Sequence, residues 1–157
     1  MIKNSFLFFH IIVILFTPKD SYAQQAIDSL GHYYNLFVKA KGNNDLKKAY
    51  LFFNQQKEVH NQKKDTTSLI FDLRILASIE YKFGNLHKSD ATAVTALELI
   101  EATKTASNTI EAKIGVLNHL GIVSYELKNY DRALNLYNRA LKIAQTKKQK
   151  NTIYNNN

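Results

Sequence analysis

The chain has 157 residues, of which 45% are hydrophobic and 22% are charged, and these proportions are typical of one globular domain or a short repeat array. The absence of cysteine excludes disulfides, thiolate metal sites, iron–sulfur clusters, a cysteine nucleophile and a lipid-attachment cysteine. One proline and 5 glycines are few for an all-β protein and favour long helices with short connections.

The formal net charge is +8, which can favour binding to nucleic acid or to an anionic membrane surface. The lysines are scattered along the chain, apart from Lys147, Lys148 and Lys150. These three come where a last helix would end, and cations interact favourably with that end of a helix dipole. We therefore predict a solvated, lysine-rich surface and no nucleic-acid partner.

Residues 1–23 have the pattern of a secretory signal peptide. Lys3 gives a positively charged start, residues 6–16 form an apolar core, and Ser21 and Ala23 are small residues before a cleavage site at Gln24. The apolar core is short for a bilayer span, and His10 interrupts it. The sequence thus predicts an exported protein, periplasmic or secreted, with no stable membrane span after cleavage; the alternative is an uncleaved anchor.

Apolar residues recur at helical spacing in six segments, which predicts six helices. The predicted ranges are 25–41, 46–60, 68–83, 86–102, 109–127 and 130–146. Residues 61–67 and 103–107 are polar and are predicted to be the longer connections.

Residues with capping chemistry stand between these segments. Asn44 or Asp45 is predicted to cap the second helix, Asn85 the fourth and Asn129 the sixth. Asn108 and Glu111 have the spacing of a capping box for the fifth helix. Gly84 is predicted to take the left-handed conformation that often ends a helix.

The six helices form three hairpins with a common register. Residues at matching positions are Tyr33, Leu73 and Leu117; Leu36, Leu76 and Leu120; Ala49, Ser89 and Ala133; and Phe53, Ala93 and Tyr137. A helical hairpin repeated in this way predicts a solenoid, because one hairpin cannot bury its apolar face without a neighbour.

The third hairpin resembles the tetratricopeptide repeat family through Leu117, Leu120, Gly121, Tyr130, Ala133, Tyr137 and Ala140. The second resembles it less fully, through Leu73, Leu76, Ala77, Gly84, Asn85, Leu86 and Ala96, and the first only through Leu36, Leu46, Ala49 and Phe53. Ser89, Ser124 and Gln56 depart from the family pattern, and no proline closes a repeat.

The resemblance implies an all-α, right-handed α-solenoid of three antiparallel hairpins, at residues 24–62, 63–104 and 105–147. Residues 148–157 are predicted to be a polar tail or the start of a further repeat. A solenoid normally ends in a polar capping helix, and none follows the third hairpin. Either the chain is truncated, or its last apolar edge is buried against a partner such as a second copy of the chain.

In this family the first helix of each hairpin lines a concave groove. The resemblance therefore implies a protein-binding groove at Tyr34, Val38, Lys41, Arg74, Ser78, Tyr81, Asn118, Ile122 and Tyr125. It also implies that the repeats pack through Leu36, Ala49, Leu76, Ala77, Ala96, Leu120, Gly121, Ala133, Tyr137 and Ala140. A known groove of the family binds a C-terminal carboxylate with several basic and amide side chains, and only Arg74, Asn118 and Lys41 could serve here.

Catalytic and cofactor motifs are missing from the sequence. His32, His60, His87 and His119 have no metal-ligand spacing, and there is neither a nucleophile elbow nor a glycine-rich phosphate loop. We predict that the protein is not an enzyme and needs no cofactor or metal.

The function predicted is that of an exported tetratricopeptide-repeat scaffold of the type found in Bacteroidetes, which binds a peptide or protein segment in its groove. The alternative is the N-terminal sensory part of a signalling protein, such as a membrane histidine kinase or a helix-turn-helix transcriptional regulator.

Overall fold

A computed structural model describes residues 29–103 and 107–144 of the chain, without the side chains of residues 107–109. The chain divides into two compact units, Met1–His32 and Tyr33–Asn157. Only residues 29–32 of the first unit are described, and the account below concerns the second unit. The predicted signal peptide and the tail after Ala144 lie outside the described residues, and so does the side chain of the predicted Asn108 cap.

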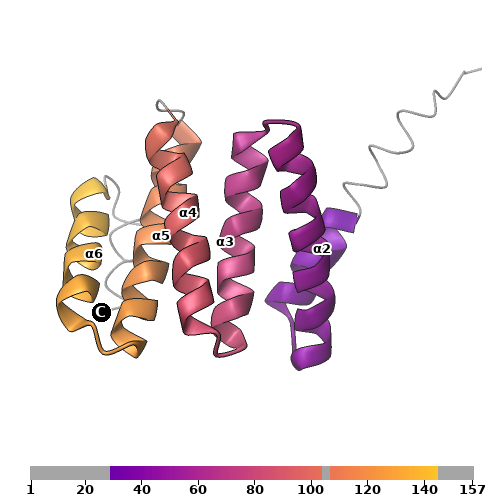
Figure 1. Cartoon of the computed structure of the whole chain (residues 1–157), viewed down its shortest axis with the longest axis horizontal. Helices are drawn as coiled ribbons and strands as arrows, with labels where there is room; N and C mark the ends of the chain where they lie inside the picture. Colours follow the sequence, from indigo (N-terminus) through magenta and orange to yellow (C-terminus); the bar gives the residue numbers. More distant parts are fainter. Residues whose placement is uncertain (1–28, 104–106, 145–157) are drawn as a thin grey trace, which may run out of the picture. The chain divides into compact units, whose positions relative to one another are not determined.

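The described residues form helices and short turns and contain no strand. Residues 29–38 are helical and are followed by α2 (Asn43–Gln62), α3 (Thr66–Lys82), α4 (Leu86–Ala102), α5 (Ser107–Glu126) and α6 (Tyr130–Ile143). From α2 to α6, each helix packs antiparallel against the next, and α3 also contacts α5 (Figure 1). This all-α helical-repeat solenoid confirms the predicted fold class.

Two of the predicted turn features are present, and two predicted caps need correction. Asn85 stands at the N-cap position of α4, but its side chain makes no capping hydrogen bond. Gly84 has φ of +76° at the end of α3, and the Asn129 side chain accepts a hydrogen bond from the backbone N–H of Arg132 at 3.2 Å, as predicted. The prediction that Asn44 or Asp45 caps α2 was wrong. Gly42 holds that position and makes no side-chain bond, because the helix begins earlier than the first apolar residue suggested.

The connection between α2 and α3 is also shorter than predicted. The sequence indicated a polar loop over residues 61–67, but α2 continues to Gln62 and α3 begins at Thr66. Asp65 makes this possible, because its carboxylate accepts a hydrogen bond from the backbone N–H of Ser68 at 3.1 Å and so caps α3.

Two clusters of buried apolar side chains form the core. One joins α2 to α3 around Phe53, Leu76 and Ile79, with aromatic rings of the N-terminal helix packed against it. The other joins α3, α4, α5 and α6 around Leu117 and Leu120. Each repeat is therefore held mainly by burial against its neighbours.

Small residues lie where helices approach closely. Ala49, Ala96 and Ala140 are completely buried, and a Cβ added to Gly121 on α5 would lie 2.6 Å from the Tyr137 ring of α6. The residues implied in repeat packing are all buried except Leu36, which is half-buried. The methyl or hydrogen side chains at these positions allow the backbones to meet.

A polar cluster joins the last two hairpins. The Arg132 guanidinium of α6 donates to both carboxylate oxygens of Asp90 on α4, at 2.6 and 3.2 Å. It also donates to the hydroxyl of Ser124 on α5 at 2.9 Å, and Ser124 is completely buried. The serine that departs from the family pattern is thus an acceptor for an inter-repeat arginine.

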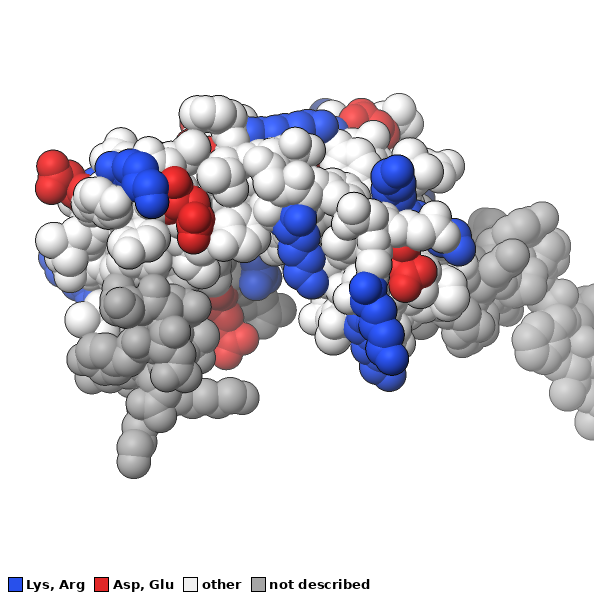
Figure 2. All heavy atoms as spheres, turned by 90° about the horizontal axis from the view of Figure 1, so that it is seen from below, with Lys and Arg blue, Asp and Glu red and all other residues white. Residues whose placement is uncertain are grey.

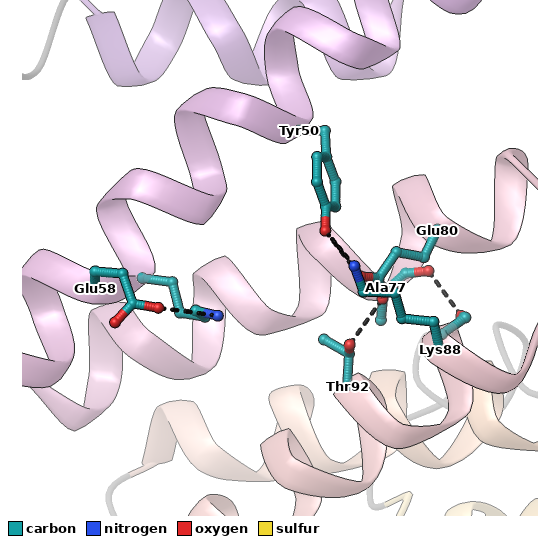
Figure 3. A network of polar contacts seen from close by, with 8 residues as sticks. Tyr50, Glu58, Ala77, Glu80, Lys88 and Thr92 are labelled. Carbon is teal, nitrogen blue, oxygen red and sulfur yellow. Dashed lines mark hydrogen bonds and ion pairs between the residues drawn. The ribbon is translucent and has the colours of Figure 1, made fainter. Parts of the chain in front are cut away.

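The preceding hairpin has an equivalent cluster made of different residues. Lys88 of α4 donates to the Tyr50 hydroxyl of α2 at 2.6 Å, and that hydroxyl donates to the Glu80 carboxylate of α3 at 3.4 Å (Figure 3). Thr92 also donates to Glu80, at 2.7 Å. Tyr50, Glu80 and Lys88 occupy the repeat positions of Asp90, Ser124 and Arg132, so the same three positions connect neighbouring hairpins twice.

None of the helices described is long and apolar enough to cross a membrane.

Candidate protein-binding groove

A cavity of about 240 Å³ opens on the side formed by the first helix of each hairpin. Its walls come from the N-terminal helix, α3 and α5, and Ala93 of α4 also lines it. Three predicted groove residues, Tyr34, Arg74 and Ser78, line it together. The remaining wall residues are Phe37, Phe71, Ile75, Ala77, Gly115, Val116 and His119.

The Arg74 guanidinium is the charged group of this cavity. It lies against the α5 backbone, so that a Cβ added to Gly115 would be 3.0 Å from its Nη2 atom. Burial lowers the pKa of Arg74, while nearby Tyr34 and Glu111 act in the opposite direction. Within the described part of the chain, the Arg74 side chain has no ion pair or hydrogen bond.

His119 lies one helical turn after Gly115 and is held by Ser89. The Ser89 hydroxyl donates to the Ala77 carbonyl at 2.7 Å and lies 2.8 Å from His119 Nε2. A hydroxyl has one proton, so Nε2 must donate to Ser89, and Nδ1 is then the atom with the free lone pair. Ser89, which replaces the alanine expected in the second helix of the hairpin, therefore fixes the tautomer of a groove histidine.

Burial lowers the pKa of His119 to about 4; Asp90 opposes this shift and Arg74 adds to it. Since the unfolded chain has a histidine pKa near 6.5, it binds a proton between these two values that the folded protein does not bind. The contribution of neutral His119 to stability is therefore complete above about pH 6.5 and is lost as the pH falls towards 4.

We predict that lowering the pH from about 7 to 5 removes about 1–2 kcal/mol of unfolding free energy through His119. Urea unfolding at both pH values measures this loss. The matched control is His119→Gln, which cannot titrate and whose pH dependence should be smaller by that amount. Equal pH dependence in the two proteins would contradict the buried, neutral histidine.

The other predicted groove residues do not line this cavity. Tyr81 is half-buried, with its ring centroid 6.0 Å from that of His119, and Ile122 is half-buried as well. Val38 and Tyr125 are exposed. Tyr125 packs edge-to-face on Tyr130 of the next helix, so it lies at the hairpin turn.

Two predictions about the groove need correction. Lys41 lies beyond the N-terminal helix, which ends at Val38, because the polar turn begins earlier than the sequence pattern suggested. Asn118 is only 4% exposed, and neither its amide oxygen nor its amide nitrogen has a hydrogen-bond partner among the residues that the structure describes. It lies on α5, which packs against both α4 and α6, so it belongs to the buried interior.

Sequence reasoning missed Gly115 and Phe71 as groove residues. Gly115 and His119 are four residues apart and share one helix face, and this face meets Arg74 only after α5 packs on α3. His119, which has no metal-ligand spacing in the sequence, also lines the cavity.

A second hollow lies among α2, α3 and α4, with a volume of about 550 Å³. Lys57, Glu58, Glu80 and Lys88 contribute charges to it. Lys57 pairs with Glu58 at 3.2 Å, and Lys88 lies 3.5 Å from Glu80. Its charges are therefore already compensated from within the chain.

A buried acid–histidine pair joins α2 to α3 away from the groove. His60 Nδ1 lies 2.5 Å from Asp72 Oδ2, and Asp72 is completely buried. Burial raises the pKa of Asp72, while the hydrogen bond with His60 lowers it. The pair holds the two helices together and does not face the cavity.

The basic side chains do not form one patch on the face drawn in Figure 2. Lysine and arginine are spread over it, with acidic side chains between them. Among the described residues, no group of three or more His, Cys, Asp or Glu side chains is placed to hold a metal ion.

Residues 115–147, which include most of α5 and all of α6, match the family model of the tetratricopeptide repeat. No curated protein and no solved structure matches the chain. The last hairpin is thus similar to a tetratricopeptide repeat and lies within a helical-repeat fold. Such repeats are typically non-catalytic, and repeat and fold together support a protein-interaction scaffold.

Proposed function

We propose that this protein is an exported interaction scaffold that binds an extended peptide or protein segment in the groove formed by its first helices. The observation that carries the proposal is the cavity between the N-terminal helix, α3 and α5, in which Arg74 has no partner from the described residues. A half-buried guanidinium without an acceptor is costly, and a ligand can supply the acceptor.

The residue types around the cavity also favour a protein ligand. Tyr34, Phe37 and Phe71 give it aromatic walls, with Tyr34 and Phe71 ring centroids 6.0 Å apart. Aromatic side chains and arginine are the residues that most often anchor protein interfaces. Ser78 and His119 add polar groups that can orient a bound chain.

Selection of a random peptide library against the full-length protein tests this proposal. We expect selected peptides to bind the wild type and to lose at least about tenfold in affinity when Arg74→Ala and Tyr81→Ala are combined. Leu51→Ala, which removes a side chain that is 69% exposed on α2, is the control and should bind normally. Peptides that bind the double variant as well as the wild type would contradict the groove assignment.

Export rests on the signal-peptide pattern of residues 1–23. The experiment is to express the full chain in a bacterium and to determine the N-terminal residue of the protein in the periplasmic fraction. We expect Gln24 as the first residue. Recovery of the protein in the cytoplasm with Met1 intact would contradict export.

A further inference from the structure

Arg74 differs from the two other arginines of the chain. Arg132 pairs with Asp90 at 2.6 Å, and Arg139 pairs with Glu101 at 3.1 Å. The Arg74 side chain lines a cavity, and no carboxylate of the described residues lies within ion-pair distance of it. Glu111 is near enough to raise its pKa, but it is an exposed residue. The cavity therefore presents a cation that has no ion-pair partner among the described residues and can accept an anionic ligand.

The shape of the cavity provides room beside this cation. Gly115 has no side chain where Arg74 Nη2 meets α5, and the cavity extends from there between aromatic walls. A carboxylate carried on one or two methylene groups suits such a site, because the carboxylate can meet the guanidinium while the methylenes contact the rings of Tyr34 and Phe71.

Two other polar groups of the cavity, on His119 and Ser78, are left as acceptors. Nδ1 of His119 has a free lone pair, since Nε2 donates to Ser89. The Ser78 hydroxyl gives its proton to the Arg74 carbonyl at 2.9 Å, so its oxygen is also left to accept. A ligand that satisfies the cavity must bring both a negative charge and N–H donors. A residue within a peptide chain brings both, through its side-chain carboxylate and the backbone N–H groups beside it.

We infer that the Arg74 cavity binds the side-chain carboxylate of an internal Asp or Glu residue of the peptide segment, with His119 and Ser78 accepting from the N–H groups of that segment. This inference rests on the proposed function and gives it a ligand chemistry.

The test uses full-length protein with labelled arginine and histidine side chains, observed by NMR. The probes are a capped pentapeptide with a central Glu between alanines, its Gln counterpart, a pentaalanine with a free C-terminal carboxylate, and inorganic phosphate. We expect the Glu peptide to shift the Arg74 Nε–H and His119 resonances saturably, with an affinity at least about tenfold above that of the Gln peptide.

Three variants complete the design. Arg74→Gln should abolish the preference for Glu, and Gly115→Ala should weaken Glu binding because the added methyl group displaces the guanidinium. Arg139→Gln removes an exposed, already paired arginine and should leave binding unchanged. Thermal unfolding followed by circular dichroism confirms that each variant is folded before binding is compared.

The inference is overturned if the Glu and Gln peptides bind equally, if the Glu peptide gives no shift at about 10 mM, or if Arg74→Gln retains the preference. Equal or tighter binding of the free C-terminal carboxylate or of phosphate would also overturn it. Library peptides that depend on Arg74 and Tyr81 but are not enriched in Asp or Glu would refute this inference while leaving the proposed function intact. Failure to select any groove-dependent peptide would refute the proposed function.

Discussion

Gly121→Ala is expected to lower the unfolding free energy by about 2–3 kcal/mol, although alanine is the better helix former. A Cβ at this position would lie 2.6 to 2.9 Å from three atoms of the Tyr137 ring. Tyr137 is itself buried, so its ring has no free space to enter and α5 and α6 must separate. Overpacking of this kind outweighs the gain of about 1 kcal/mol in helix propensity. Urea unfolding of the purified protein measures the difference.

Gly31→Ala is the matched control for this substitution. Gly31 is also in a helix, but an added Cβ there would meet nothing within 4 Å. The change should therefore be neutral or stabilising by up to about 1 kcal/mol. Combining Gly121→Ala with Tyr137→Leu removes the obstructing ring and should give a smaller loss than the two single losses added together. Additive losses would show that the ring is not the cause.

Arg132→Met is expected to lower the unfolding free energy by about 2 kcal/mol. Methionine retains an apolar stem but removes the donors to Asp90 and to the buried hydroxyl of Ser124. Asp90 then has no cationic partner, and Ser124 loses an inter-helix bond in a position from which water is excluded. Both changes cost free energy, and unsatisfied buried groups cost more than exposed ones. Chemical unfolding is again the measurement.

Lys88→Met provides the comparison within the same chain. Lys88 occupies the repeat position of Arg132, but its side chain is 59% exposed, against 34% for Arg132. Solvent screens the Lys88 interactions, so the loss should stay below about 1 kcal/mol. Equal losses in the two variants would show that the hydrogen bonds of Arg132 contribute no more to stability than those of Lys88. A double-mutant cycle of Arg132→Met with Asp90→Asn then isolates the coupling between these two side chains.

Local patterns in the sequence were sufficient for the helices and for their grouping into hairpins. Gly84 and Asn129 are in the predicted conformations at their turns, because capping depends on residues within one turn of the helix. Asp65 was missed as a cap because it stands in a polar run in which several residues have the same local chemistry.

The groove could be predicted only in part. The helix face containing Arg74 and Ser78 follows from periodicity, and both line the cavity. Asn118 has the same repeat position as Arg74, but it is buried. Side chains at equivalent repeat positions leave their helices in the same direction. Their exposure, however, depends on which helices pack over them.

The sequence by itself determined the all-α class, the three hairpins and the small residues at their contacts, because helical periodicity and side-chain size are local properties. Only the tertiary structure decided which polar groups meet. Ser89 reaches His119 across 30 residues, and Arg132 reaches Asp90 across 42. The same packing that brings Arg132 to Asp90 places Arg74 beside Gly115. There Arg74 has no ion-pair or hydrogen-bond partner among the described residues. Pairing over such separations depends on how the helices stack, which no single stretch of sequence specifies.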